Sequence, residues 1–276
     1  MSDKRILYVT QEIAPYLSET ELSLLGRKLP QRVHELGFEV RTFMPKYGCI
    51  NERRNQLHEV IRLSGMNIII NDSDHPLIIK VASLQPSRIQ IYFIDNEDFF
   101  QKSDDDIDEK GSNRSDNDER SIFFARGTME TVRKLNWKPM VVHCQGWISA
   151  LVPLYLKTMY ADDPSFRDLK IIYSVTEDKY EGLWPSFLVE KLKMDNIPVE
   201  NLTSILDKEI DINSLHKLAI DHSDGVIFGH SDIDPEVVKH AESKSIPCLT
   251  YDKVSESIDS YAEFYNLFIE KEQNED

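Results

Sequence analysis

The sequence has few cysteines, few glycines and no long apolar segment. Its three cysteines, Cys49, Cys144 and Cys248, are odd in number and lie far apart. This pattern argues against a disulfide framework or a zinc site and is typical of a reducing compartment, so we expect a cytoplasmic protein. No apolar run approaches the ~20 residues that cross a bilayer, and the N-terminus lacks the apolar core of a signal peptide.

Basic residues are also scarce, because 32 Lys and Arg oppose 48 Asp and Glu and give a net charge of −16. Nucleic acids and anionic membranes select basic surfaces, so we expect neither as a partner. The common motifs of nucleotide-binding, hydrolase and zinc-protease sites (Gly-x-Gly-x-x-Gly, Gly-x-x-x-x-Gly-Lys, Gly-x-Ser-x-Gly and His-Glu-x-x-His) are missing. We therefore expect no bound metal and no cofactor.

What the sequence does contain is a regular alternation of strand and helix patterns. This alternation predicts an α/β fold with a doubly wound, Rossmann-like parallel sheet that is covered by helices on both faces. The predicted strands cover residues 5–10, 38–45, 57–70, 77–82, 89–94, 140–144, 169–175, 225–228 and 247–251, and the predicted helices cover residues 22–36, 120–135, 147–160, 212–221, 235–243 and 255–270.

No composition shift marks a domain boundary, so we expect residues 1–276 to form a single domain. Two segments interrupt the pattern. Residues 104–119 are mostly acidic and polar and predict a mobile loop, because they cannot bury apolar area. Residues 184–210 predict an irregular insertion with a helical part.

Several sequence blocks in one collinear order resemble the N-terminal half of bacterial glycogen synthases and plant starch synthases. The similarity covers roughly residues 5–230 and rests on residues 6–15, 36–41, 44–50, 91–96, 120–124, 137–147, 150–157 and 160–162, followed by Tyr180 and Gly182. It implies the first of the two Rossmann-like domains of the glycosyltransferase-B fold. The resemblance also implies ADP-glucose as a donor and a glucan as an acceptor.

The loop after the first strand departs from this family. The family carries Lys-Thr-Gly-Gly, whose backbone N–H groups, helix N-terminus and lysine would bind a diphosphate. Here the aligned residues are Ser18, Glu19, Thr20 and Glu21. We expect Ser18 and Glu21 to form a capping box at the start of the helix, with carboxylates where a diphosphate would lie.

The residues at two further strand ends also differ from the family pattern. The resemblance aligns Gly146 and Ile148 with an Asp and a His that help to place the acceptor and the reacting sugar. It aligns Thr176 and Glu177 with a His-Asn pair whose His is a central active-site residue. A threonine cannot replace an imidazole that titrates near neutral pH.

Five other residues near these positions remain candidates for binding: Glu12, Tyr47, His143, Trp147 and Tyr180. Each has a structural alternative. Trp147 either stacks on a sugar or packs in the core, and a lone His143 is either functional or a hydrogen-bonded structural residue.

The leading hypothesis is a non-catalytic relative of these synthases that binds a glucan, a protein partner or a second copy of itself. The sequence after residue 228 replaces the family's second domain with a short ending that we expect to complete the fold. One rival is an active ADP-glucose:α-1,4-glucan glucosyltransferase that takes its second domain from another chain. The other is a different small-molecule site in the crevice beyond the carboxyl ends of the strands.

Overall fold

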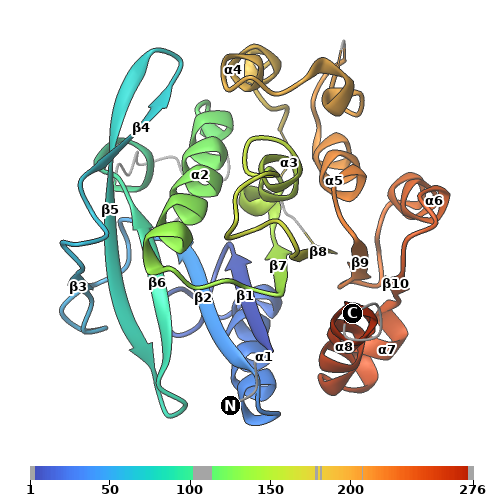
Figure 1. Ribbon diagram of the computed structural model, residues 1–276, viewed down its shortest axis with the longest axis horizontal. Coiled ribbons are helices and arrows are strands. Elements are labelled where there is room, and N and C mark those ends of the chain that lie inside the picture. Colours follow the sequence, from blue (N-terminus) through green and yellow to red (C-terminus); the bar gives the residue numbers. More distant parts are fainter. Residues whose placement is uncertain (1–3, 102–113, 178–179, 181, 207, 273–276) are drawn as a thin grey trace.

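The computed structural model describes residues 4–272, apart from 102–113, 178–179, 181 and 207. A mixed sheet in the order β10-β9-β8-β7-β1-β2-β6-β5-β3, with β4 paired to β5, runs through the described residues (Figure 1). Its strands are β1 Arg5–Thr10, β2 Glu39–Pro45, β3 His58–Glu59, β4 Met66–Ile70, β5 Ser73–Leu84, β6 Ile89–Asp95, β7 Val141–Gln145, β8 Lys170–Val175, β9 Gly225–Phe228 and β10 Cys248–Leu249.

The strands from β10 to β6 are parallel, as the alternation predicts. The edge formed by β3, β4 and β5 is antiparallel, which the sequence analysis did not predict. The connections explain the difference. Asn71 and Asp72 have positive φ angles of 49° and 60° and join β4 directly to β5. Such a tight turn leaves no room for a crossover, so consecutive strands must run in opposite directions.

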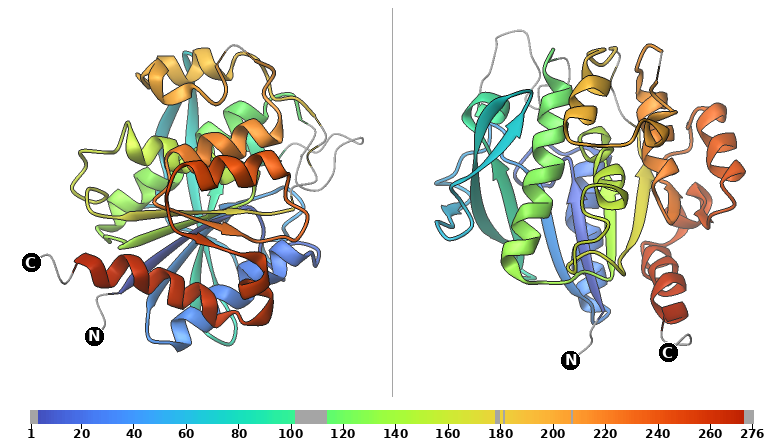
Figure 2. Two further views of the ribbon diagram at one scale, coloured as in Figure 1. Left: turned by 90° about the vertical axis from the view of Figure 1, so that its right-hand side faces the viewer. Right: turned by 45° about the horizontal axis from the view of Figure 1, so that its top comes forward.

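Helices cover both faces of the sheet. Figure 2 shows α1 and α8 on one face and α2, α3 and α5 on the other. The helices are α1 Glu21–Glu35, α2 Asn117–Leu135, α3 Val152–Lys157, α4 Leu188–Met194, α5 Ile212–Asp221, α6 Pro235–Ser243, α7 Tyr251–Glu256 and α8 Asp259–Glu272, with short turns at Glu97–Gln101 (η1), Trp147–Ser149 (η2) and Val199–Leu202 (η3).

Several predicted boundaries were wrong. Helix α2 begins at Asn117, so the last three residues of the predicted loop 104–119 are helical, and Asn117 and Asp118 are fully buried. Burial of Asp118 is compensated by the ammonium group of Lys191. Residues 104–113 of that loop lie outside the described residues. The helix predicted over 147–160 is divided into η2 and α3, and the strand predicted over 247–251 covers only Cys248–Leu249.

The insertion at 184–210 contains α4 and η3, as its partly helical pattern predicts. Its ends meet in an antiparallel bridge between Trp184 and Ile210. The two ends of the insertion are therefore held side by side.

Helix α8 is attached to the sheet through a buried chain of hydrogen bonds. The Tyr8 hydroxyl donates to the Tyr265 hydroxyl (3.3 Å), and the Tyr265 hydroxyl lies 2.7 Å from His143 Nδ1. On the other side of the ring, His143 Nε2 lies 2.6 Å from the Ser174 hydroxyl. All four side chains are fully buried. Burial lowers the pKa of His143 to about 3, so its imidazole is neutral at physiological pH.

This buried histidine predicts a loss of stability in acid. In the unfolded chain His143 accepts a proton near its ordinary pKa of 6.5, whereas in the folded chain it resists protonation down to about pH 3. The contribution of the neutral His143 imidazole to the unfolding free energy is therefore complete above pH 6.5 and declines as the pH falls toward 3. At pH 5 the wild type should have lost about 2 kcal/mol of unfolding free energy through this group alone.

His143→Gln, which cannot titrate, should escape this loss. The difference in unfolding free energy between wild type and variant, measured by urea denaturation, should shrink by about 2 kcal/mol between pH 7.5 and pH 5. Replacement of the exposed His58 by Gln is the matched control for the loss of an imidazole outside the core. A constant difference for His143→Gln would contradict the assignment of a neutral, buried imidazole.

Candidate functional site

The loop after β1 lies directly against helix α1. A Cβ atom added at Gly26 would stand 2.4 Å from the Glu12 carbonyl oxygen, so only a glycine permits this approach. Glu12 itself is 4% exposed. Close packing therefore fixes the loop that the resemblance identifies as the donor loop.

The N-terminus of α1 is capped by Thr20 and Ser23. The Thr20 hydroxyl accepts a hydrogen bond from the Ser23 backbone N–H (3.0 Å), and the Ser23 hydroxyl accepts one from the Thr20 backbone N–H (2.8 Å). The predicted box of Ser18 and Glu21 is therefore wrong, because Glu21 is already the first helical residue. Ser18 contributes only its carbonyl oxygen, which accepts from the Ser23 hydroxyl (3.0 Å).

A carboxylate of the chain itself also lies at this helix end. The Thr20 hydroxyl donates to Glu12 Oε2 at 2.8 Å. A negative charge near the N-terminus of a helix is stabilised by the helix dipole. Glu12 thus supplies an internal anion at the position where the resemblance implies a diphosphate.

Side chains also occupy the space at the carboxyl end of β7. Gly146 has a φ of +83°, and a Cβ added there would stand 2.6 Å from the Cβ of Gln11. An aspartate at this position would therefore displace the Gln11 side chain. Ile148 is fully buried. Gln11 Oε1 and Gln145 Nε2 are buried without a hydrogen-bond partner in the described part of the chain.

Thr176 and Glu177 follow β8, the neighbour of β7. Among the described residues, the buried Thr176 hydroxyl has no hydrogen-bond partner. Glu177 is exposed, and its carboxylate lies 4.0 Å from His230 Nε2. Because β1, β7 and β8 are adjacent and parallel, the positions that the resemblance singles out meet at one edge of the sheet.

The aromatic candidates are covered by other side chains. Trp147 is 1% exposed and packs 5.7 Å from Tyr180 and 5.6 Å from Trp184, measured between ring centroids. Tyr180 is 7% exposed, and Tyr47 is 1% exposed against Phe100. With His143 in the buried chain below α8, these residues occupy core positions.

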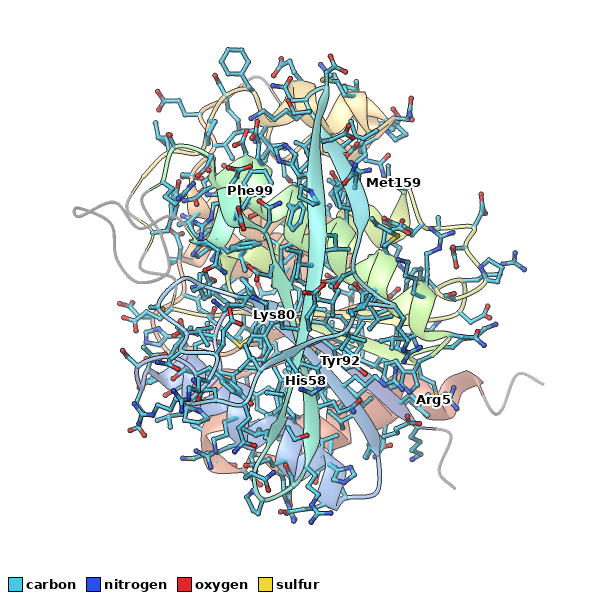
Figure 3. All side chains as sticks on the ribbon, turned by 90° about the vertical axis from the view of Figure 1, so that its left-hand side faces the viewer. Arg5, His58, Lys80, Tyr92, Phe99 and Met159 are labelled. Atoms are coloured by element: carbon cyan, nitrogen blue, oxygen red, sulfur yellow. The ribbon has the colours of Figure 1, made fainter. Side chains whose placement is uncertain are left out.

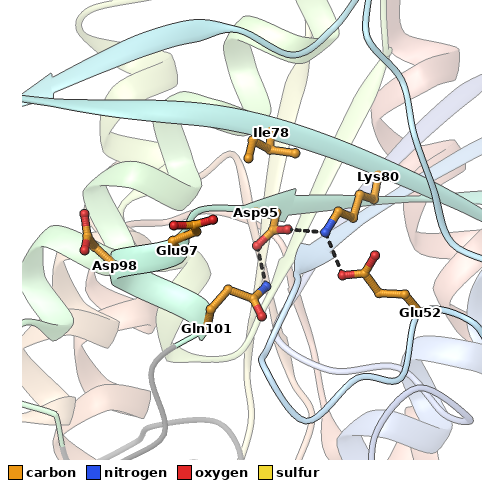
Figure 4. Close-up of a pocket in the computed structure, with 7 residues that line it drawn as sticks. All are labelled: Glu52, Ile78, Lys80, Asp95, Glu97, Asp98 and Gln101. Carbon is orange, nitrogen blue, oxygen red and sulfur yellow. Dashed lines mark hydrogen bonds and ion pairs between the residues drawn. The ribbon is translucent and has the colours of Figure 1, made fainter.

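A pocket of about 560 Å³ beside β5 and β6 was missed by the sequence analysis. Figure 3 views this side of the molecule, with Lys80 near its centre. Figure 4 shows the residues that line it: Glu52, Ile78, Lys80, Asp95, Glu97, Asp98 and Gln101. They come from three separate stretches of the chain, at residue 52, residues 78–80 and residues 95–101, so no single sequence motif predicts the pocket. Asp95 at the carboxyl end of a predicted strand was the one available signal.

Ion pairs organise the inner wall of this pocket. Lys80 Nζ lies 2.6 Å from Glu52 Oε1 and 2.8 Å from Asp95 Oδ2, and Lys46 Nζ lies 3.1 Å from Glu52 Oε1. Burial raises the pKa of the Glu52 carboxyl, but the hydrogen bonds from Lys80 and Lys46 outweigh burial and leave that pKa below its ordinary value. Burial lowers the pKa of Lys80, yet its two carboxylate partners leave it raised.

Metal-binding clusters and membrane-spanning helices are both absent from the described residues. No group of three or more His, Cys, Asp or Glu side chains there is placed to hold a metal ion. In the same part of the chain, no helix is both long and apolar enough to cross a membrane.

Comparisons with known proteins agree on one family. The family described as "Starch synthase catalytic domain" matches residues 5–244. The glycogen synthase of Pelodictyon phaeoclathratiforme is 35% identical over 221 residues, which are 80% of this chain and 44% of the relative. The glycogen synthase of Chlorobium limicola is 36% identical over the same shares. The chain thus spans less than half the length of these curated relatives.

A solved structure is also similar: "Catalytic domain of Starch Synthase IV from Arabidopsis thaliana bound to ADP and acarbose". It matches with a TM-score of 0.69 and 18% identity over 90% of this chain and 52% of that chain. The mostly parallel sheet with flanking helices is therefore an α/β fold of the glycosyltransferase-B type. The chain belongs to the starch synthase catalytic domain family.

The cap at α1 predicts that the side chain of Thr20 contributes more to stability than the side chain of Ser18 does. Thr20→Ala removes the cap and the hydrogen bond to Glu12, and should lower the unfolding free energy by about 1–2 kcal/mol. Ser18→Ala, the matched control, keeps the carbonyl that contacts Ser23 and should change stability by less than about 0.5 kcal/mol. Chemical denaturation of both variants tests this. A larger loss for Ser18→Ala than for Thr20→Ala would reverse the assignment of the cap.

Proposed function

We propose that this chain is a non-catalytic member of its family, which binds a glucan or a protein partner without transferring glucose. The observation that carries the proposal is the closed N-terminus of α1. Thr20 and Ser23 satisfy its first N–H groups, and the Glu12 carboxylate is hydrogen-bonded at its end. A diphosphate would have to displace the capping hydrogen bonds of Thr20 and Ser23.

The other strand ends support the same conclusion. Gly146, Ile148 and Thr176 lack the titratable groups that the family pattern has at these positions. The exposed Glu177 adds negative charge near the edge where the strands end. Together these residues weaken both donor binding and the placement of a reacting sugar.

The rival proposal is an active ADP-glucose:α-1,4-glucan glucosyltransferase that is completed by a second domain or subunit. Two observations favour it: the family membership, and the ADP and acarbose bound to the similar plant enzyme. A third proposal is an unrelated small molecule at the strand ends. It draws on buried polar atoms of Gln11, Gln145 and Thr176 that have no hydrogen-bond partner within the described part of the chain.

We further propose that residues 1–276 act as one domain and work in the cytoplasm. Support for one domain comes from the sheet, which joins strands from Arg5 to Leu249. Support for the location comes from the odd number and wide spacing of Cys49, Cys144 and Cys248, which are typical of a reducing compartment.

The decisive test is a transfer assay. The purified chain, incubated with ADP-[¹⁴C]glucose and glycogen, should incorporate no more label than a heat-denatured sample. A full-length glycogen synthase in parallel provides the positive control. Calorimetry should likewise detect no binding of ADP, because the helix end that would receive the diphosphate is occupied.

Label incorporated above the denatured control would refute the non-catalytic proposal. Incorporation that appears only when a second domain or subunit is added would establish the rival. Binding of maltotetraose without transfer would establish the glucan-binding form of the proposal.

A further inference from the structure

A further cavity lies where the central parallel strands begin, at the opposite edge of the sheet from the candidate site. It has a volume of about 240 Å³. Its lining comes from Arg5, the first residue of β1, and from residues 138–140 and 164–169, which lead into β7 and β8. In Figure 3, Arg5 lies well away from both Lys80 and Phe99. The cavity is therefore separate from the strand ends and from the pocket beside β5 and β6.

Backbone hydrogen bonds hold the walls of this cavity in place. The Met140 backbone N–H donates to the Arg5 carbonyl oxygen (2.9 Å), and the Lys170 backbone N–H donates to the Met140 carbonyl oxygen (2.8 Å). The turn that carries Ser165 is fixed as well, because the Ser165 backbone N–H donates to Asp163 Oδ1 (2.8 Å). The cavity is thus largely pre-formed, as small-molecule sites in proteins usually are.

Charged groups of both signs lie at the cavity. Arg5 and Lys138 supply cations, and Asp168 supplies a carboxylate. Arg5 is oriented by Glu39, since Arg5 Nε lies 3.1 Å from Glu39 Oε2. Glu39 is held in turn by the buried Trp137, whose Nε1 donates to Glu39 Oε1 (2.7 Å). Two cations and two anions therefore balance one another, and a ligand with a net charge would disturb this balance.

The rest of the lining is mostly apolar and comes from Pro139, Met140, Pro164 and Leu169. Pro139 and Leu169 are buried. The volume of about 240 Å³ lies below the ~300–1,000 Å³ of sites for drug-sized ligands, so that a ligand has to be small. A carboxylate, an ammonium group and a short apolar side chain on one carbon atom are the parts of an apolar α-amino acid. These parts match the opposite charges and the apolar surface of the cavity.

From this lining we infer that the cavity binds an apolar α-amino acid as a zwitterion. Lys138 and Arg5 hold its carboxylate, Asp168 holds its ammonium group, and its side chain packs on Pro139 and Leu169. The inference goes beyond the proposed function and does not depend on it, because the cavity and the candidate site are formed by different residues. A bound amino acid would connect the beginnings of β1, β7 and β8 and stabilise the folded chain.

The test is calorimetry of the full chain with L-leucine as the probe. Lys138→Met removes a cation from the carboxylate and should weaken leucine binding about tenfold. Asp168→Asn should weaken leucine binding by a similar factor, because it removes the partner of the ammonium group. The same Asp168→Asn change should not weaken binding of 4-methylpentanoate, the analogue of leucine that has no ammonium group.

The controls carry the same charge changes elsewhere on the surface. Lys28→Met on α1 and Asp232→Asn after β9 replace exposed side chains and should bind leucine as the wild type does. Lys138 and Asp168 are also exposed, so that their variants should fold, and unchanged circular dichroism spectra verify this.

Three results would overturn the inference. The first is leucine binding that both Lys138→Met and Asp168→Asn retain in full, which would place the amino acid at another surface. The second is equal affinity of the wild type for leucine and 4-methylpentanoate, which would make the cavity a site for anions. The third is the absence of any leucine binding at millimolar concentration. Each of these results leaves the transfer assay and the proposed function unaffected.

Discussion

The contact between helix α1 and the loop after β1 is the constraint on which the candidate site depends. At Gly26 the helix lies so close to the Glu12 carbonyl that no side chain fits between them. The position of the helix end then follows, since Thr20 must reach both Ser23 and Glu12. The closed helix terminus is therefore a consequence of backbone packing at Gly26 as well as of the side chains of Thr20 and Ser23.

Much of the fold could be predicted because its physical signals are local. Apolar residues at spacings of three and four mark α1 and α5, and short apolar runs mark the parallel strands. The antiparallel edge was missed because strand direction depends on the length and conformation of connections, such as the turn at Asn71 and Asp72. The start of α2 was missed because Asn117 and Asp118 look like loop residues until burial and the partner Lys191 are known.

In the candidate site, too, contacts between residues far apart in the sequence were missed. The resemblance singled out residues at the carboxyl ends of β1, β7 and β8. Its capping prediction was wrong, because two overlapping capping patterns compete at the start of α1. Ser18 with Glu21 and Thr20 with Ser23 both fit the sequence, and only the helix start at Glu21 decides between them. The pocket at Lys80 was missed, because the pairing of β5 with β6 brings Lys80 to Asp95 and a loop far away in the sequence supplies Glu52.

The buried chain from Tyr8 through Tyr265 to His143 has a consequence for how the protein folds. Tyr8 and Tyr265 are 257 residues apart, and their hydroxyl groups meet between β1 and helix α8. Contacts between such distant residues carry a large loop-closure entropy and slow the folding of a domain. During synthesis, the face of β1 and β7 that α8 covers stays exposed until residues 259–272 have left the ribosome. Until then Tyr8, His143 and Ser174 lie on an uncovered face of the sheet, and such surfaces promote aggregation of folding intermediates.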